Sequence, residues 1–304
     1  MSILTVDAGG SSIKYALCDD AMSLGGHGKI PNTFATQDEF IEAIAAVCEA
    51  NRDEVTGIAL SYCGELDPST GMVFNGGSYG FNTGTNLKRV LSERCGVPVA
   101  MESDGNCAAL AEVRRGNLRG HADSVTLVLG TGVACSIVIG GKPWHGSHFF
   151  SGAVSFAAVD LRKDMGWDNV CAAACGANGL TGIYERLVGA GRGSVDGFAF
   201  FDLVGQGDEF ACRALDEFCG NVARLVANLQ LVLDVPAFSI GGGISAQPAL
   251  REGILRAVER VWESQPMRVA HVPMPEVVFC ALGNDSNLIG AACHFVESAA
   301  DLIA

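Results

Sequence analysis

The chain has 304 residues, enough for one large domain or two of ordinary size. With 20 basic and 34 acidic side chains, its formal net charge is -14, so its field repels nucleic-acid phosphates and anionic membranes, and we expect neither as a partner. Hydrophobic residues make up 49% of the chain, but no apolar run approaches the ~20 residues that span a bilayer. The start, MSILTVDAGG, has no secretory pattern, and we expect a cytoplasmic protein.

The first half of the chain alternates strand and helix patterns. An apolar run, Ile3 to Asp7, and a second, Ile13 to Cys18, flank Gly9-Gly10-Ser11-Ser12 and predict two strands joined by a glycine turn. Further helices are predicted at 40–48, 86–91 and 106–115, and strands at 55–61 and 97–101. This alternation predicts an α/β fold with a mainly parallel sheet.

The opening pattern recurs in the second half. Strands at Ser124 to Leu129 and Ala134 to Ile139 flank Gly130-Thr131-Gly132. Later strands are predicted at 237–240 and 276–281, and helices at 180–188, 208–233, 247–262 and 284–303. We expect two similar lobes, 1–118 and 119–285, facing each other across a cleft, where ligand sites are common. Packing of a C-terminal helix, 286–304, back on the first lobe is left open.

Twelve cysteines are spread through the predicted elements rather than concentrated in a short secreted module. We interpret them as small buried hydrophobes that stay reduced, including Cys48, Cys107, Cys135, Cys212, Cys219 and Cys293.

Three glycine turns follow predicted strands. Backbone N–H groups in such turns can form a nest for phosphate oxygens, although a hairpin also uses glycine for its conformation alone. The turns are Gly9-Gly10, Gly130-Thr131-Gly132 and Gly241-Gly242-Gly243. The sequence contains no GxxxxGK[ST] and no GxGxxG after a strand, which disfavours a P-loop or Rossmann enzyme.

The segment 7–14, DAGGSSIK, resembles the DxGGTxxK phosphate motif of the ROK family of sugar kinases and repressors, with Ser11 replacing threonine. The segment 102–110, ESDGNCAAL, resembles that family's ENDANAAAL segment. The later glycine turns fall where the family has its second phosphate loop and its adenosine loop. The resemblance implies the actin-like, duplicated ribonuclease-H-type ATPase fold, with two lobes and a central cleft.

The resemblance also implies the roles of individual residues. Asp104 matches the catalytic aspartate that accepts the proton of the attacking hydroxyl, although its position equally fits a helix N-cap. Asp7 is expected to hold Mg²⁺ through water, and it also fits an Asx turn. The residues expected to hold ATP are Asp7, Gly9, Gly10, Ser11, Gly130, Thr131, Gly132, Gly241, Gly242 and Gly243.

The sequence departs from the family where a sugar is usually held. The ExGH segment is replaced by Ala153-Val154-Ser155-Phe156, which removes both polar groups, and Ser103 replaces the usual asparagine before Asp104. A buried hydroxyl without a partner costs ~1–3 kcal/mol, so a hexose should bind badly in the usual way. Substrate contacts are instead expected from Gly64, Glu65, Asn75, Ser103, Asp104 and His145, with Tyr62 and His148 as further candidates.

The family's zinc-binding cysteine motif is also reduced. Cys171 and Cys175 remain, but Leu180 stands where a third cysteine is expected. Two thiols cannot complete a four-ligand site, so we expect no zinc and interpret both cysteines as core residues one helical turn apart.

These observations predict a Mg-ATP-dependent kinase for a hydroxyl, the primary 6-hydroxyl, of a sugar or carbohydrate derivative with an atypical pocket. The family also implies a homodimer. The alternative is a degenerate ROK-fold sensor that binds ligand or nucleotide without turnover, motivated by the two missing polar groups. A repressor is disfavoured because the phosphate motif begins at Asp7, leaving no room for an N-terminal helix-turn-helix, and because the chain lacks a basic face.

Overall fold

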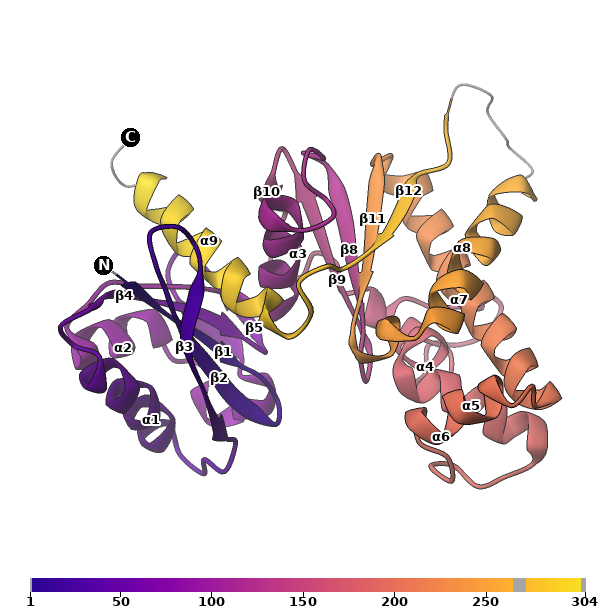
Figure 1. Ribbon diagram of the computed structural model, residues 1–304, viewed down its shortest axis with the longest axis horizontal. Coiled ribbons are helices and arrows are strands. Elements are labelled where there is room, and N and C mark those ends of the chain that lie inside the picture. The colour runs from indigo at the N-terminus through magenta and orange to yellow at the C-terminus, as the bar shows by residue number, and fades with distance from the viewer. Residues whose placement is uncertain (1, 265–271, 302–304) are drawn as a thin grey trace. The chain divides into compact units, whose positions relative to one another are not determined.

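Figure 1 shows the computed structural model of the chain, which describes residues 2–264 and 272–301. The chain forms two compact units. The first contains Met1–Arg119, Lys142–Ser151 and Leu282–Ala304, and the second contains Gly120–Gly141 and Gly152–Ala281. By their contacts, residues 142–151 group with the first unit, whereas the sequence division assigned them to the second lobe.

The first unit is built on a five-stranded sheet with the order β3-β2-β1-β4-β7. Its strands are β1 (Ser2–Ala8), β2 (Ser12–Cys18), β3 (Leu24–Pro31), β4 (Val55–Tyr62) and β7 (Val99–Ser103). Strands β1, β4 and β7 are parallel, and β2 and β3 continue the sheet in antiparallel pairs. Because parallel strands end at the same edge, the residues that follow β1, β4 and β7 lie close together.

Helices cover both faces of this sheet (Figure 1). The helices α1 (Gln37–Ala50) and α2 (Leu87–Cys95) share a core with β1, β4 and β7 that includes Phe40 and Leu91. The helices α3 (Asp104–Arg115) and α9 (Ser286–Asp301) pack together on the other face. Gly290 permits that packing, because a Cβ there would lie 1.8 Å from the Cys107 carbonyl oxygen. The sequence predicted α9 as 284–303, and residues 302–304 lie outside the described part of the chain.

The second unit repeats the plan of the first. The strands β9 (Val133–Ile139), β8 (Ser124–Leu129), β11 (Ala237–Gly241) and β12 (Glu276–Phe279) follow one another across the second sheet. Here β8 and β9 form an antiparallel hairpin, and β11 is parallel to both β8 and β12. Since β8, β9, β11 and β12 correspond in order and direction to β1, β2, β4 and β7, the predicted duplication of the α/β fold is confirmed.

Five helices of the described residues contribute to one hydrophobic core together with the second sheet. They are α4 (Cys171–Cys175), α5 (Ala177–Val188), α6 (Gly197–Gly205), α7 (Glu209–Leu233) and α8 (Pro248–Glu263). The short elements of the chain are β5 (Glu65–Asp67), β6 (Met72–Asn75), β10 (Lys142–Pro143), η1 (Gly77–Asn82), η2 (Val154–Phe156), η3 (Gly243–Ala246) and η4 (Gly283–Asp285). Within residues 2–264 and 272–301, no helix is both long and apolar enough to span a membrane.

The interpretation of the cysteines as buried residues holds for five of the six named above. Cys48, Cys107, Cys135, Cys219 and Cys293 are buried. The interpretation is wrong for Cys212, which is exposed. Ala211, Ala214 and Leu215 of α7 face the core, and Cys212 lies in the first turn of the same helix, at the margin of this buried face.

Candidate active site

Asp7 lies at the carboxyl edge of the first sheet, one residue before the end of β1. Its neighbour in the parallel register is Ser61 on β4, whose hydroxyl donates to Asp7 Oδ1 over 3.0 Å. Asn287 Nδ2, from the start of α9, donates to the same oxygen over 3.0 Å. Asp7 is 5% exposed, and its Oδ2 accepts from no residue that the structure describes. One oxygen is thus fixed, and the other is available to a ligand.

Asp104 begins α3 directly after β7 ends at Ser103. The Gly105 N–H donates to Asp104 Oδ1 over 2.7 Å. Burial raises the pKa of Asp104 to about 6, and the charge of Asp7 adds to this effect against the opposing Gly105 hydrogen bond. A carboxylate with a pKa near neutrality is suited to accept a proton from a substrate hydroxyl. The N-cap of α3 is Ser103, so the alternative role of Asp104 as the cap residue is wrong.

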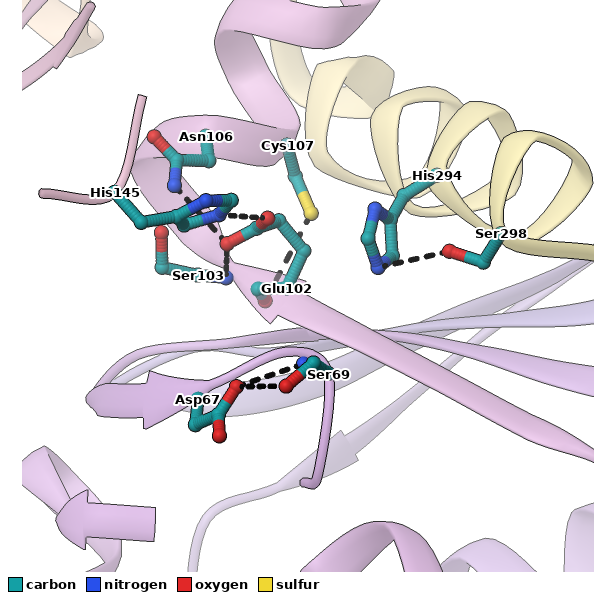
Figure 2. A network of polar contacts seen from close by, with 9 residues as sticks. All are labelled: Asp67, Ser69, Glu102, Ser103, Asn106, Cys107, His145, His294 and Ser298. Carbon is teal, nitrogen blue, oxygen red and sulfur yellow. Dashed lines mark hydrogen bonds and ion pairs between the residues drawn. The ribbon is translucent and has the colours of Figure 1, made fainter. Parts of the chain in front are cut away.

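Glu102, two residues before Asp104, forms an ion pair with the partly exposed His145 (Figure 2). His145 Nε2 lies 2.7 Å from Glu102 Oε2, and Glu102 is 1% exposed. Glu102 Oε1 accepts from the Ser103 N–H over 2.8 Å and from Asn106 Nδ2 over 3.0 Å. The Glu102 carboxylate therefore accepts three hydrogen bonds, and the one from His145 Nε2 fixes the orientation of the imidazole ring.

The pair shifts the pKa of both partners. The hydrogen bond to Glu102 raises the pKa of His145. Burial alone would raise the pKa of Glu102, but the hydrogen bond and charge of His145 bring it below its ordinary value. A second histidine, His294, projects from α9 near the pair, and its Nε2 lies 3.3 Å from the Ser298 hydroxyl (Figure 2). Burial lowers the pKa of His294, so His145 binds a proton more readily than His294 does.

Three of the expected substrate-binding residues, Gly64, Glu65 and Asn75, lie at the β5–β6 ribbon, whereas Ser103 and Asp104 lie at the junction of β7 and α3. Glu65 pairs with Asn75 across this ribbon, and Asn75 Oδ1 accepts from the Gly77 N–H over 3.1 Å. Gly64 precedes β5, and a Cβ there would lie 2.4 Å from the Asn75 carbonyl oxygen. Packing against the Asn75 backbone therefore explains the glycine at position 64, whether or not this residue contacts a ligand.

The candidate role of Tyr62 in substrate binding is wrong. Its side chain is 0% exposed, and its hydroxyl donates to the Gly76 carbonyl and accepts from Asn82 Nδ2. Tyr62 therefore fixes the loop after β6 from inside the core. His148 is exposed in the loop after β10.

The first glycine turn joins β1 to β2. Tyr79 donates to the Gly9 carbonyl over 2.8 Å and Asn32 Nδ2 donates to the Gly10 carbonyl over 2.9 Å, so the turn is held from both sides. Gly10 and Ser11 are exposed, and their N–H groups have no acceptor among the described residues. These amides are free to bind an anion.

The two glycine turns of the second unit lie side by side. The parallel strands β8 and β11 end at the same edge, and Gly241 pairs with Val128. Gly242 has a φ of 99°, and a Cβ there would lie 2.2 Å from the Leu129 carbonyl oxygen. A Cβ on Gly243 would meet nothing within 4 Å, and Thr131 is exposed. The second unit thus has two adjacent glycine turns, at Gly130–Gly132 and Gly241–Gly243.

The segment 153–156 contacts the turn at Gly130–Gly132. Ser155 Oγ accepts from the Val133 N–H over 2.9 Å and donates to the Val133 carbonyl over 3.0 Å. A Cβ on Gly132 would lie 2.8 Å from the same hydroxyl. Ala153 carries no polar group, and Phe156 is 47% exposed and packs edge-on to Trp167. Ser155, the polar residue of this segment, is therefore engaged with the backbone next to the turn.

Cys171 and Cys175 are buried one helical turn apart on α4, as predicted, and Leu180 is 0% exposed. Among the described residues, no group of three or more His, Cys, Asp or Glu side chains is arranged to hold a metal ion. A single carboxylate such as Asp7 still fits Mg²⁺, which keeps several waters and takes its other ligands from substrate phosphates.

The sequence did not identify Ser61, Asn287 or Glu102 as parts of the site. Ser61 ends a predicted strand beside the strand of Asp7, which is a usable signal because parallel strands bring their ends together. Glu102 lies inside the ENDANAAAL-like segment, but its partner His145 is 43 positions away. Asn287 and Asp7 are 280 positions apart, and neither has a local pattern that points to the other.

A model of the ROK family matches residues 3–297, and the chain belongs to this family. It is 27% identical to a beta-glucoside kinase of Klebsiella pneumoniae, over 97% of this chain and 96% of that protein. It is 26% identical to an N-acetylmannosamine kinase of Escherichia fergusonii, over 96% of this chain and 97% of that protein.

A ROK family glucokinase of Streptomyces griseus, solved with glucose and AMPPNP, has the same fold, with a TM-score of 0.76 and 24% identity over 96% of this chain and 98% of that one. The fold that the resemblance implied, the actin-like two-lobe ATPase fold, is thereby confirmed. These comparisons support a carbohydrate kinase.

Proposed function

We propose that the protein transfers the γ-phosphoryl group of ATP to a hydroxyl of a sugar or carbohydrate derivative, with the primary 6-hydroxyl as acceptor. The observation that carries the proposal is Asp104, a carboxylate at the edge of the first sheet whose pKa is raised to about 6 next to Asp7. Membership of the ROK family and the kinase names of the relatives support the same reaction.

In this proposal Asp104 accepts the proton of the acceptor hydroxyl while the hydroxyl oxygen attacks the γ-phosphorus and ADP leaves. The amides of the three glycine turns, with the hydroxyls of Ser11 and Thr131, bind phosphate oxygens and the nucleotide. Asp7 would hold Mg²⁺ through water, and the ion would neutralise charge on the phosphates. This arrangement needs no protein cage for the metal.

Acceptor binding falls to polar groups of the first unit in place of the missing ExGH pair. We propose Glu65, Asn75 and His145 as hydrogen-bonding groups, with Gly64 and Ser103 supplying backbone and hydroxyl contacts. His145 supports this role because Glu102 engages Nε2 and leaves Nδ1 available, with 28% of the side chain exposed. The homodimer expected from the family is part of the proposal, and light scattering on the purified protein tests it.

The test measures ADP release over a panel of monosaccharides, disaccharides, N-acyl sugars and polyols, for the wild type, Asp104→Asn and Asp67→Asn. Asp67 is a control because Ser69 and Thr70 hold its carboxylate and we assign it no contact with ATP or the acceptor; its charge is one of the smaller causes of the raised pKa of His145. We expect Asp104→Asn to lose turnover while ATP still binds, and Asp67→Asn to keep it. A 6-deoxy analogue of any substrate should not react.

The alternative is a sensor that binds without turnover, favoured by Ala153 and Phe156 in place of the family's polar pair. Nucleotide and sugar binding by the wild type, with no ADP release on any member of the panel, would establish this alternative and refute the kinase.

A further inference from the structure

A cavity of about 560 Å³ lies at the β7 edge of the first sheet. We call it the edge cavity. Its volume falls in the ~300–1,000 Å³ range of sites for small organic ligands. Strand β7 and the helices α2 and α9 supply most of its walls, and all of its lining residues belong to the first unit. The lining includes Thr56, Lys88, Arg89, Glu93, Phe295 and Ser298.

The edge cavity is separate from the candidate active site. Thr56 lines it near the start of β4, whereas Ser61, which holds Asp7, lies near the end of the same strand. Five residues of extended strand separate Thr56 from Ser61, which corresponds to roughly 16 Å. The described residues that line the cavity include none of those proposed to bind ATP or the acceptor. A ligand bound here would therefore leave those residues free.

Two cations line the cavity from the first turn of α2. Lys88 and Arg89 are the second and third residues of this helix, and its first turn contains no acidic residue. Neither forms an ion pair with a carboxylate of the described residues, and the Lys88 ammonium donates one hydrogen bond, to the Ser69 carbonyl over 3.2 Å. Because a helix N-terminus already carries partial positive charge, cations there are unfavourable and an anion is stabilising. In a chain of net charge -14, this uncompensated positive charge indicates a place for an anion.

The remaining walls of the edge cavity are largely apolar. Pro98, Val99 and Ala100 line it from the start of β7. The Phe295 ring lines it from α9 and packs on Gly57 of β4, where a Cβ would lie 2.2 Å from the ring. Gly57 thus makes room for the ring. A ligand that matches the cavity needs an anionic end for the two cations and a ring or another apolar group for this wall.

The edge cavity adjoins the polar network of Figure 2. Ser298 lines the cavity from α9, and its hydroxyl lies 3.3 Å from His294 Nε2. Burial lowers the pKa of His294, and the positive charge of Lys88 acts in the same direction. An anion that neutralises Lys88 would therefore change the electrostatic surroundings of His294. The imidazole of His294 can thus report on a ligand in the cavity.

We propose that the edge cavity binds an organic phosphomonoester, at a site separate from those for ATP and the acceptor. Lys88 and Arg89 hold the phosphate, which offers three acceptor oxygens and about 1.5 to 2 negative charges. The organic group lies against Phe295 and the start of β7. A carboxylate would bring less charge and fewer oxygens to the same two cations. The bound phosphate would also stabilise the start of α2.

Isothermal titration calorimetry on the full chain at low ionic strength tests the proposal, with phenyl phosphate, inorganic phosphate and phenol as probes. We expect phenyl phosphate to bind about three- to tenfold more tightly than either of the others, because it alone uses both the cations and the apolar wall. Lys88→Gln and Arg89→Gln should each weaken phenyl phosphate about tenfold. Glu93→Gln removes the one carboxylate among the described lining residues and should tighten binding.

Lys29→Gln is the matched control. Lys29 is an exposed lysine of β3, at the opposite edge of the same sheet, and its replacement should leave the affinity for phenyl phosphate unchanged. The replaced side chains are all at least partly exposed, so the Tm of each variant should stay close to that of the wild type. In NMR, phenyl phosphate should shift the imidazole signals of His294 in the wild type and not in Lys88→Gln at the same concentration.

Equal affinities of the wild type, Lys88→Gln and Arg89→Gln for phenyl phosphate would place the anion elsewhere, such as at the turn of Gly9 to Ser11, and would overturn the proposal. Binding without a shift at His294 would do the same, as would inorganic phosphate binding as tightly as phenyl phosphate. ADP release over the panel of sugars depends on Asp104 and not on this cavity, so either proposal can fail without the other.

Discussion

Replacing Asp104 with asparagine should stabilise the folded protein while lowering its activity about 10²- to 10⁴-fold. The folded-state pKa is about 6, roughly two units above the ordinary value of 3.8, because burial and Asp7 disfavour the carboxylate. Each unit corresponds to about 1.4 kcal/mol, and discounting for the partial exposure of Asp104 we expect the charged carboxylate to cost the folded state about 1–3 kcal/mol.

The sign follows from proton binding. Between pH 4 and pH 6 the folded protein retains a proton at Asp104 that the unfolded chain has released, so the stability of the wild type falls as the pH rises through this window. The amide of the substituted asparagine has no charge to desolvate. In urea denaturation, Asp104→Asn should therefore exceed the wild type by about 1–3 kcal/mol at pH 8, and the difference should disappear toward pH 4.

Asp67→Asn supplies the opposite sign as a control. Burial would raise the pKa of Asp67, but hydrogen bonds from Ser69 and Thr70 bring it below its ordinary value, so this carboxylate stabilises the fold above pH 4. Its replacement should lower stability at pH 8. If Asp104→Asn were also less stable than the wild type at pH 8, Asp104 would be a structural residue of the α3 start, and the reasoning above would be refuted.

Activity should follow the same titration, with kcat/KM rising to a plateau around a midpoint near pH 6 and falling about 10²- to 10⁴-fold in Asp104→Asn. Gly242→Ala should lower stability by about 1–3 kcal/mol, because alanine is strained at its positive φ and the new Cβ would clash with the Leu129 backbone. A Cβ at position 243 meets no atom, so Gly243→Ala should fold normally and lose only affinity for ATP, measured by calorimetry. Glu102→Gln should return the pKa of His145, measured by NMR, toward 6.5, and an unchanged titration would contradict the pairing. The same variant should lose most stability between pH 4.5 and 6.5, where both partners are charged. Tyr62→Phe should cost about 1–3 kcal/mol in urea denaturation and leave the acceptor KM unchanged, and a raised KM would restore its rejected role.

The repeated strand–turn–strand pattern was enough to predict the duplicated fold, because both halves place a glycine turn between two apolar runs. Strand β3 was not predictable in this way. Its sequence, LGGHGKIP, has three glycines and little apolar alternation, and it is a strand because β2 pairs with it. Gly28 even has a tertiary reason, since a Cβ there would lie within 2.2 Å of the Tyr15 ring.

The candidate site was predictable where its residues follow parallel strands, as Asp7 and Asp104 do. Tyr62 also ends such a strand, yet it is buried, because the alternation of side chains across β4 directs it into the core while Ser61 faces Asp7. Sequence position gives the edge of a sheet more readily than the face on which a side chain lies. The His145 contact depends on a loop returning to β7, which no local pattern encodes.

Through Ser155, the segment 153–156 stabilises the backbone beside the glycine turn at Gly130–Gly132. The Ser155 hydroxyl hydrogen-bonds to both the N–H and the carbonyl of Val133, next to Gly132. Substitutions in segment 153–156 should therefore change nucleotide affinity more than they change the choice of acceptor. Restoring glutamate and histidine at positions 153 and 156 would leave the support from Ser155 intact. Under the proposed function, in which Glu65, Asn75 and His145 hold the acceptor, this double change would not by itself produce a hexose kinase.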